Sequence, residues 1–221
     1  MSVKVFVPRE STALSLGADE IAEAISLAAA DIGADIELIR NGSRGLLWLE
    51  PMIEVETDRG RVAYGPVGVE DVDTLVEAGL FEGGQSHALA LGLTDEIPQL
   101  KAQTRVSFKR IGLDDPLSLD AYRQRGGFRG LQDALSKSGQ EIIDEVKASG
   151  LRGRGGAAFP SGIKWQTVHD AQATQKYIVC NADEGDSGTF ADRLIMECDP
   201  YLLIEGMTIA GLAVGASEGY I

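Results

Sequence analysis

The sequence LRGRGGAAFPSGIKW at residues 151–165, followed by YIVCNADEGDSGTFADR at residues 177–193, is the most informative part of this chain. Three glycines, Gly153, Gly155 and Gly156, fall within four positions of the first stretch, where they expose backbone N–H groups and remove side-chain obstruction. The second stretch begins as a short apolar strand and continues into a polar loop, and α/β folds place ligands at the carboxyl ends of strands. Together the two stretches predict an α/β fold whose loops face a ligand.

The glycine-rich stretch also fits a dinucleotide-binding pattern, because Gly153, Gly155 and Ala158 have the spacing G-x-G-x-x-A. That fingerprint must follow a strand and open a helix. Here the preceding residues predict a helix that ends at Gly150, and Pro160 follows shortly after the glycines. We therefore do not assign the usual dinucleotide fold to this loop.

The composition of the same loop still indicates what it can bind. Arg152, Arg154 and Lys164 bring positive charge to a chain of net charge −14. Phe159 and Trp165 offer flat apolar faces. Backbone amides, cations and aromatic faces together suit a flavin or nucleotide, which carries both phosphate and a ring. A glycine-rich surface loop with incidental arginines is the alternative, and composition alone leaves both open.

The polar loop that follows residues 177–180 is the second candidate site. Asn181 offers donors and acceptors, and Asp183, Glu184 and Asp186 place three acids within four positions. Like charges this close repel one another, which favours a ligand that is recognised there. A solvated acidic turn, or one that starts the next helix, is the alternative. No histidine lies nearby to complete a typical transition-metal set, so we predict no metal site.

The N-terminal third of the chain predicts a different kind of domain. A strand, a helix, a strand, two hairpin strands and a helix are expected at residues 3–7, 18–31, 35–39, 52–57, 61–64 and 69–78. This order over residues 1–80 matches a thioredoxin-like fold. Thioredoxin-like ferredoxins carry cluster-ligating cysteines in the loop before the hairpin, whereas no cysteine here precedes Cys180. Iron–sulfur clusters of this type need thiolates, so we expect a structural or docking module without a cluster.

The segments between these regions have weaker patterns. Residues 81–116 show little periodicity but have a local basic character. We expect them to form a solvated linker that wraps the next domain. Short helices are predicted at residues 117–124 and 128–137. The sequence Ser138-Gly-Gln-Glu141 is a capping box ahead of a further helix. The second domain is therefore placed at residues 117–221.

Bulk properties limit the classes of partner. A net charge of −14 repels nucleic acid and anionic membranes, so neither is expected as a partner. No apolar run reaches the roughly 20 residues of a membrane span. The richest run, Tyr201 to Ala216, contains Glu205. With no basic-apolar leader, and with Cys180 and Cys198 best interpreted as small core residues, we expect a reduced, cytoplasmic protein.

The two motifs, in this order and at this spacing, resemble the paired signature of the flavoprotein subunit of respiratory complex I. The resemblance extends from about residue 117 to the terminal Gly219-Tyr-Ile221. The same family includes the diaphorase subunits of NAD-reducing hydrogenases and the flavin-bearing beta subunits of NAD-dependent formate dehydrogenases. A fused thioredoxin-like unit without cysteines is most similar to the formate dehydrogenase subunit, which we rank above the hydrogenase diaphorase, and that above complex I itself.

The resemblance implies a flavin site made by both loops, with NADH stacked on FMN. By position it implies cofactor-binding roles, and no catalytic or metal-ligating role, for Gly153, Arg154, Gly155, Gly156, Phe159, Lys164, Asn181, Asp183, Glu184 and Asp186. Ala158 and Ser161 stand where the family usually has glycine and threonine. Asp186 stands where the family usually has glutamate, at the nucleotide end of the site.

The resemblance also implies a reaction and partners. Hydride would pass between NAD(H) and FMN, and single electrons would pass through iron–sulfur clusters to or from a molybdenum or tungsten subunit that oxidises formate. A small thioredoxin-like 2Fe-2S subunit would be a further partner. The family continues beyond Ile221 with the rest of the flavin fold, and its 4Fe-4S site is expected only there, so the chain resembles an N-terminal portion. The alternative from a different class is a non-catalytic docking fragment.

Overall fold

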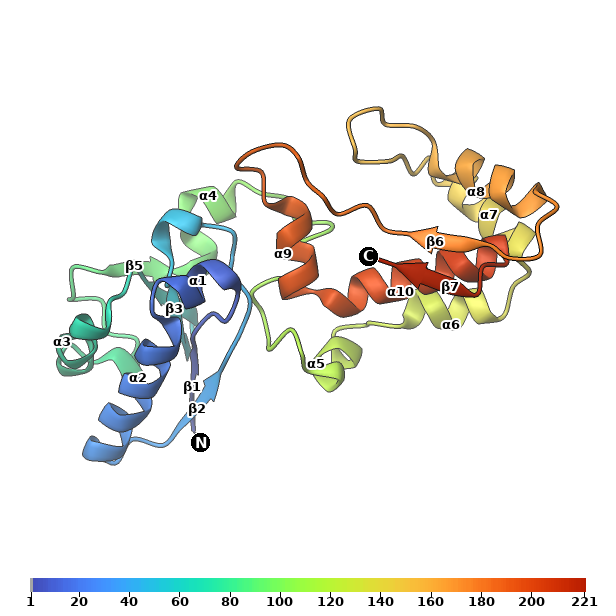
Figure 1. Cartoon of the computed structure of the whole chain (residues 1–221). Coiled ribbons are helices and arrows are strands. Elements are labelled where there is room, and N and C mark those ends of the chain that lie inside the picture. Colours follow the sequence, from blue (N-terminus) through green and yellow to red (C-terminus); the bar gives the residue numbers. More distant parts are fainter. Residues whose placement is uncertain (1) are drawn as a thin grey trace. The chain divides into compact units, whose positions relative to one another are not determined.

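The computed structural model describes residues 2–221, which divide into two compact units (Figure 1). The first, called here the N-terminal unit, contains the residues up to Ala121 together with Leu194–Asp199. The second, the C-terminal unit, contains Tyr122–Arg193 and Pro200–Ile221. Each unit has a cluster of buried apolar residues of its own, so each packs around a separate core.

The N-terminal unit is built on a five-stranded sheet, with helices and 3₁₀ turns between the strands. The strands are β1 (Val3–Phe6), β2 (Ile36–Ile39), β3 (Ile53–Thr57), β4 (Gly60–Tyr64) and β5 (Ala90–Leu93). The helices are α1 (Ser11–Ser15), α2 (Ala18–Ile32), α3 (Val72–Glu77) and α4 (Pro98–Lys101). The 3₁₀ turns are η1 (Leu47–Leu49), η2 (Val69–Asp71), η3 (Leu80–Glu82) and η4 (Thr94–Glu96).

The order of strands in this sheet is β2-β1-β3-β4-β5. β1 and β2 run parallel, whereas β3 pairs antiparallel with both β1 and β4. A parallel β-α-β unit, followed by an antiparallel hairpin on the other side of the first strand, is the thioredoxin-like arrangement. The predicted α/β fold with a thioredoxin-like N-terminal part is therefore confirmed.

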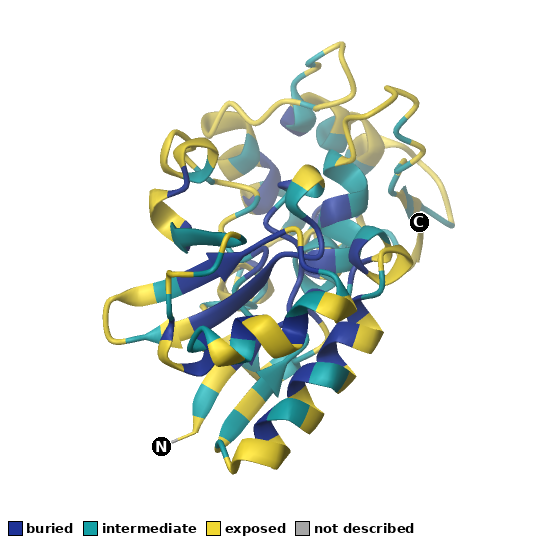
Figure 2. Ribbon diagram, turned by 90° about the vertical axis from the view of Figure 1, so that its left-hand side faces the viewer, coloured by how far each residue is buried: buried dark blue, intermediate teal, exposed yellow. Residues whose placement is uncertain are grey.

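Helix α2 shows how the sequence builds this core. Ile21, Ile25 and Ala29 recur at helical spacing and are buried. They belong to the same apolar cluster as Val5 of β1. Gly33 ends the helix with a left-handed backbone, φ +70°, which glycine adopts without steric cost. Figure 2 shows the buried residues following the strands and one side of this helix.

The region expected to be a linker, residues 81–116, is instead part of the N-terminal unit. Its residues 90–93 form β5, which pairs antiparallel with β4. Further along, the backbone oxygens of Gly112 and Leu113 accept hydrogen bonds from Arg61 of β4, at 3.1 and 2.6 Å. The sequence of β5, ALGL, is too short and too poor in β-branched residues to predict a strand, and its pairing with the open edge of β4 makes it one.

The segment Leu194–Asp199 also belongs to the N-terminal unit, although it lies far along the chain. Leu194 and Cys198 are buried with Ile111 in a small apolar cluster. Cys198 fills the space beside Gly42, where an added Cβ would lie 2.6 Å from the Cys198 Cβ. Residue 42 must therefore be a glycine for this segment to pack as it does.

The C-terminal unit is mostly helical. Helix α5 (Leu119–Gln124) leads into it, and the helices that follow are α6 (Arg129–Leu135), α7 (Gly139–Ala148), α8 (Ser161–Asp170), α9 (Ala191–Cys198) and α10 (Pro200–Val214). Strands β6 (Tyr177–Val179) and β7 (Glu218–Tyr220) pair in parallel. Helix α9 begins in this unit, and its last residues belong to the N-terminal unit.

The core of the C-terminal unit is formed by residues that pack against α10. Ala213 and Val214 at the end of α10 are buried with Ile142 and Ile143 of α7 and with Ala134 of α6. The apolar run that begins at Tyr201 is therefore helical and forms the centre of the unit. Within residues 2–221, no helix is both long enough and apolar enough to span a membrane.

The capping box predicted at the start of α7 is confirmed. Ser138 Oγ accepts a hydrogen bond from the backbone N–H of Glu141 at 3.3 Å, and Glu141 Oε2 accepts one from Ser138 N at 2.8 Å. Gly150, with φ +68°, follows the end of the helix. Both ends of α7 are therefore set by local sequence, and so is the point from which the glycine-rich loop departs.

Candidate functional site

The glycine-rich loop is closed at its neck by hydrogen bonds across the chain. Gly153 N donates to the backbone oxygen of Phe159 at 2.9 Å. Arg152 forms a β-bridge with Pro160, and its Nη1 donates to the backbone oxygen of Ala158 at 2.8 Å. Arg152, whose charge was expected to attract a ligand, therefore braces the neck of the loop with its side chain.

Beyond this neck, the tip of the loop leaves its backbone amides open. Within the described residues 2–221, the N–H groups of residues 154–158 make no hydrogen bond to the chain. A Cβ added at Gly155 or Gly156 would have no atom within 4 Å. Gly156 and Ala158 have left-handed φ angles of 89° and 50°. Successive N–H groups in such turns form concave anion-binding surfaces, so the tip offers several unpaired donors to one ligand.

Two cations and an aromatic side chain lie at the predicted positions around this tip. Arg154 is exposed on the loop, and Lys164 is exposed in the first half of α8. Lys164 Nζ lies 6.0 Å from the centre of the Phe159 ring, and Phe159 is 46 % exposed. An open ring face beside an ammonium group suits a ligand that has both an aromatic ring and negative charge.

Close packing of α7 against α8 holds the two ends of the loop. Gly162 lies so near Lys147 that an added Cβ would be 2.6 Å from Lys147 Cγ and 2.9 Å from its backbone N. Lys147 Nζ donates a hydrogen bond to Gln166 Oε1 of α8 at 2.6 Å. A cavity of about 310 Å³ lies at the base of the loop, with Leu151 and Ile163 among its lining residues. The helices thus fix the loop and leave an apolar surface beside it.

The polar loop after β6 presents most of its predicted side chains to solvent. Asn181, Asp183 and Asp186 are exposed. Asn181 Oδ1 accepts a hydrogen bond from Asp183 N at 3.2 Å, and the backbone oxygen of Asp186 accepts one from Thr189 N at 3.3 Å. These local bonds shape the loop but leave the carboxylates of Asp183 and Asp186 outward.

Glu184 differs from its neighbours because its carboxylate caps helix α9. Its Oε1 accepts hydrogen bonds from the backbone N–H groups of Ala191 and Asp192 at 2.5 and 3.0 Å, and its Oε2 accepts from Arg193 N at 3.2 Å. Burial acts to raise the pKa of Glu184, but these three hydrogen bonds and the charge of Arg193 hold it below its ordinary value. Of the two alternatives for the acidic loop, the structure places Glu184 in the one that starts the next helix.

The structure brings the predicted residues together in two groups. One group surrounds the tip of the glycine-rich loop, and the other lies at residues 181–186. Within the part of the chain that the structure describes, no hydrogen bond or ion pair joins residues 151–165 to residues 181–190. The assignment of both groups to one cofactor site therefore stays a prediction.

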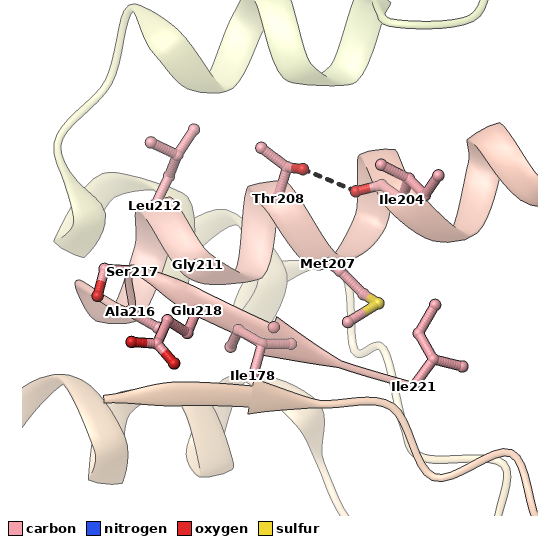
Figure 3. A pocket seen from close by; sticks show the side chains of 11 residues that line it. Ile178, Ile204, Met207, Thr208, Gly211, Leu212, Ala216, Ser217, Glu218 and Ile221 are labelled. Atoms are coloured by element: carbon pink, nitrogen blue, oxygen red, sulfur yellow. Dashed lines mark hydrogen bonds between the residues drawn. The ribbon is translucent and has the colours of Figure 1, made fainter. Parts of the chain in front are cut away.

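A cavity of about 410 Å³ lies in another part of the C-terminal unit, between one side of α10 and the two strands β6 and β7 (Figure 3). Met207 and Ile178 are among the apolar side chains that line it. The hydroxyl of Thr208 already donates to the backbone oxygen of Ile204, at 2.7 Å (Figure 3). None of the ten predicted cofactor-binding residues lines this cavity, so it is separate from the predicted site.

Sequence reasoning gave no role to Glu205, yet its carboxylate organises the start of the C-terminal unit. Glu205 is 7 % exposed. Its Oε2 accepts hydrogen bonds from the hydroxyl of Tyr122 and from Phe128 N, the latter at 2.8 Å, and its Oε1 accepts one from Leu131 N at 3.0 Å. An acidic residue in an otherwise apolar helix was the signal, because a buried carboxylate is costly unless it is hydrogen-bonded.

The two cysteines are free thiols in different surroundings. Cys198 is buried, as predicted for a core residue, and burial raises the pKa of its thiol to about 12. Cys180 is only partly buried, and burial together with the nearby Asp192 raises the pKa of its thiol. Among the described residues, no three His, Cys, Asp or Glu side chains are placed to hold a metal ion.

The second half of the chain is similar to known proteins. Residues 146–221 match the model of the family described as the Nuo51 FMN-binding domain. Over 121 residues the chain is 48 % identical to the NADP-reducing hydrogenase subunit HndC of Solidesulfovibrio fructosivorans, a match that covers 55 % of this chain and 24 % of that protein. Over 126 residues it is 44 % identical to the mitochondrial NADH-ubiquinone oxidoreductase 51 kDa subunit of Neurospora crassa, covering 55 % and 25 %.

The chain thus spans 24 % and 25 % of the length of these two relatives. Among solved structures, it is similar to the thioredoxin-like [2Fe-2S] ferredoxin from Aquifex aeolicus, over 41 % of this chain and 97 % of the ferredoxin. The sequence identity in that comparison is 22 %, and the TM-score is 0.36.

Proposed function

We propose that this chain forms part of an FMN- and NAD(H)-binding site in a flavoprotein subunit of the NADH-dehydrogenase type. The observation that carries the proposal is the tip of the glycine-rich loop, where the amides of residues 154–158 are unpaired within the described chain and Arg154 is exposed among them. In a chain of net charge −14, such a local concentration of donors suits the phosphate of a cofactor. The match of residues 146–221 to the Nuo51 FMN-binding domain family supports FMN as that cofactor.

The residues of both loops fit this cofactor chemically. Arg154 and Lys164 would face the phosphate, and Phe159 would offer its open face to a stacked ring. Asn181 and Asp183 would supply polar contacts to the edge of the flavin. When bound, FMN supplies hydride exchange with NAD(H) and single-electron exchange with iron–sulfur clusters, while the protein supplies binding and orientation.

Two acidic residues of the polar loop would have separate roles. The exposed carboxylate of Asp186 can accept hydrogen bonds from ribose hydroxyls of NAD(H), as acidic residues do at other dinucleotide sites. Glu184 would act as a positioning residue, because its oxygens hold the first turn of α9 and so fix the end of the loop.

Within this class we propose the beta subunit of a cytoplasmic NAD-dependent formate dehydrogenase, with a molybdenum or tungsten catalytic subunit and a small 2Fe-2S subunit as partners. The absence of cysteines from residues 1–121, which contain the thioredoxin-like sheet, supports this choice. A diaphorase subunit of an NAD-reducing hydrogenase, or a complex I subunit, is the alternative that the named relatives favour. NAD⁺ reduction by the purified assembly with formate, and its absence with hydrogen, would support the first choice, and the reverse result would exclude it.

The proposed FMN site can be tested on the chain itself with two variants of one glycine. Gly155→Pro removes an N–H donor from the tip, whereas Gly155→Ala keeps the donor and places its Cβ in open space. We expect the proline variant to bind FMN about tenfold more weakly and the alanine variant to bind it normally, measured by quenching of flavin fluorescence. Equal affinities of the two variants would contradict binding through the backbone amides.

The non-catalytic alternative is tested by the same titration. A chain that shows no flavin absorbance after purification, and that does not quench added FMN, would be a docking fragment rather than a cofactor-binding one. Saturable binding of one FMN per chain would exclude that alternative.

A further inference from the structure

A small cavity in the N-terminal unit is lined by charges that do not neutralise one another. It has a volume of about 210 Å³ and is bordered by Arg44, Asp95, Leu100 and Arg105. Asp95 belongs to η4 and Leu100 to α4, so two short elements of the region expected to be a linker form one side. Neither arginine forms an ion pair with Asp95 within residues 2–221. The charged side chains that line the cavity are therefore not paired with one another.

Arg44 is held rigidly at this cavity. It is 8 % exposed, and its Nε and Nη2 donate to Glu54 Oε1 and Oε2 at 2.6 and 2.7 Å. This two-point contact fixes the plane of the guanidinium group. Its Nη1 makes no hydrogen bond within the described chain and is not among the buried, unsatisfied atoms, so it remains accessible for a further hydrogen bond.

Arg105 approaches the same space from the other side. Its Nη2 donates to the backbone oxygen of Arg44 at 2.5 Å, and its Nε donates to Gln103 Oε1 at 3.0 Å. Burial and the neighbouring Arg44 lower the pKa of the Arg105 guanidinium, because two cations are held together there. As with Arg44, the Nη1 of Arg105 has no hydrogen-bond partner within residues 2–221. Two cationic side chains, each held by hydrogen bonds and each with one donor left unpaired, thus line the same small cavity.

The other two lining residues restrict what can bind. The single charge of Glu54 is shared by Arg44 and Arg61 and also attracts Arg105, which is opposed by Asp95 as well. A multiply charged anion in the cavity would be repelled by the Asp95 carboxylate. Leu100 supplies an apolar wall, which suits a methyl or methylene group rather than a fourth polar oxygen. The chemistry is that of a small monocarboxylate.

We propose that this cavity binds a small aliphatic monocarboxylate, with its two oxygens between Arg44 and Arg105 and its apolar end against Leu100. Planar guanidinium groups match the geometry of a carboxylate, and this match is the basis of recognition. The site lies wholly within the N-terminal unit and uses none of the residues proposed to hold FMN or NAD(H). Its failure would therefore leave the proposed function untouched.

The probe is sodium acetate, titrated into the full chain at pH 7 and constant ionic strength, with sodium chloride and sodium phosphate as competing anions. The side-chain Nε–H resonances of ¹⁵N-labelled arginines report the binding. Saturable shifts of the Arg44 and Arg105 resonances with acetate are expected. Shifts no larger than those with chloride, or tighter binding of phosphate than of acetate, would overturn the proposal.

Two substitutions in the cavity should change the affinity for acetate in opposite directions, and each has a matched control. Arg105→Gln should weaken acetate binding about tenfold, and Asp95→Asn should strengthen it about fivefold. Arg59→Gln and Asp58→Asn change the net charge by the same amounts at the exposed β3–β4 turn, and should leave the dissociation constant unchanged. If each control moved the constant as much as its partner, binding would reflect only the overall charge, and the site would be rejected.

Discussion

Two loops of this molecule, residues 41–50 in the N-terminal unit and residues 152–160 in the C-terminal unit, differ in where their polar groups find hydrogen-bond partners. In the first, Ser43 and Glu50 are buried. Ser43 Oγ donates to Glu50 Oε1 at 2.5 Å, and Glu50 Oε2 accepts from Met52 N at 3.0 Å. In the second, the backbone amides at the tip have no partner within the described chain.

The difference separates stability from binding. Ser43 and Glu50 are satisfied by each other and by the backbone, so unlike Arg44 in the same loop they have nothing left to offer a ligand. Removing one of them leaves its partner buried and unpaired. Donors that point outward contribute little to folding but remain available for recognition. Substitutions in and around the first loop should therefore change the free energy of unfolding, whereas substitutions around the second should change affinity and leave folding intact.

The largest effect on stability is expected at Glu54, which anchors the loop at residues 41–50 through its contact with Arg44. Glu54 is fully buried and also pairs with Arg61, whose Nη1 lies 3.3 Å from Glu54 Oε2. Glu54→Gln leaves two largely buried guanidinium groups without their counter-charge. We expect the free energy of unfolding of the N-terminal unit to fall by about 3–5 kcal/mol. Amide hydrogen exchange of β3 and β4 measures this loss.

The neighbouring Glu56 on the same strand provides the control. It forms an exposed ion pair with Lys4, with 3.6 Å between Nζ and Oε2. Glu56→Gln should cost less than about 1 kcal/mol, because solvent screens exposed pairs. Similar losses of unfolding free energy in Glu54→Gln and Glu56→Gln would show that buried charges do not hold the loop at residues 41–50.

The next effect concerns pH and Glu50. Burial raises the pKa of Glu50 from 4.5 to about 7, although hydrogen bonds from Ser43 and Met52 oppose the rise. A folded-state pKa above the unfolded value gives stability that is complete below pH 4.5 and is lost as pH rises through about 7. Glu50→Gln should remove this loss, so that at pH 8 the variant is more stable than the original chain by about 2–3 kcal/mol.

Urea unfolding at pH 4 and pH 8 tests this expectation. The two proteins should differ at pH 8 and approach each other at pH 4, because Glu50 is mostly neutral in both the folded and the unfolded state only below pH 4.5. Glu37→Gln, at an exposed position of β2, should follow the original chain at both values. Parallel pH profiles for Glu50→Gln and the original chain would contradict a neutral, buried Glu50.

Around the loop at residues 152–160, we expect substitutions to weaken the binding of FMN. Lys164→Ala removes the ammonium group beside Phe159 and should weaken FMN binding about tenfold, since a charge-assisted hydrogen bond contributes about 1.5–3 kcal/mol. Its thermal unfolding should be unchanged. Lys109→Ala, which removes an exposed charge from the N-terminal unit, is the matched control. If Lys164→Ala lowered the thermal stability but left FMN affinity unchanged, the proposed difference between the two loops would be wrong.

The smallest effect is expected at Asp186, and it concerns cofactor choice. The exposed carboxylate of Asp186, which we propose to lie at the nucleotide end of the site, should favour NAD(H). It would repel the 2′-phosphate of NADP(H) by roughly 1 kcal/mol when largely screened. Asp186→Ala should raise the ratio of kcat/KM for NADPH to that for NADH severalfold in the assembled enzyme with an artificial electron acceptor. Asp186→Glu should keep the original ratio. An unchanged ratio in the alanine variant would remove Asp186 from cofactor selection.

Local patterns predicted much of this fold because the elements concerned are set by neighbouring residues. The period of Ile21 and Ile25 defined α2, and the exchange of hydrogen bonds between Ser138 and Glu141 defined the start of α7. β5 could not be predicted, because ALGL becomes a strand only when β4 offers it an edge. Long-range pairing of this kind leaves no periodic signal in a short segment.

The candidate site was predictable to a similar depth. The glycines at the tip indicated unpaired amides, and the structure places those amides in the open. The use of Arg152 as a brace was not evident, and the role of Glu184 at the start of the next helix was only one alternative for the acidic loop. A charged side chain in a loop can serve a ligand or the backbone equally well. Which of the two it serves depends on where the chain turns next, and composition does not contain that information.

The placement of Leu194–Asp199 in the N-terminal unit has a consequence for how the protein is made. Residues leave the ribosome in order, so Leu194 and Cys198 appear only after both candidate loops have been synthesised. Until then, the apolar surface of Ile111 and the gap beside Gly42 stay in contact with water. The N-terminal unit therefore completes its core during, and not before, the synthesis of the C-terminal unit, and the two units mature in an interleaved order.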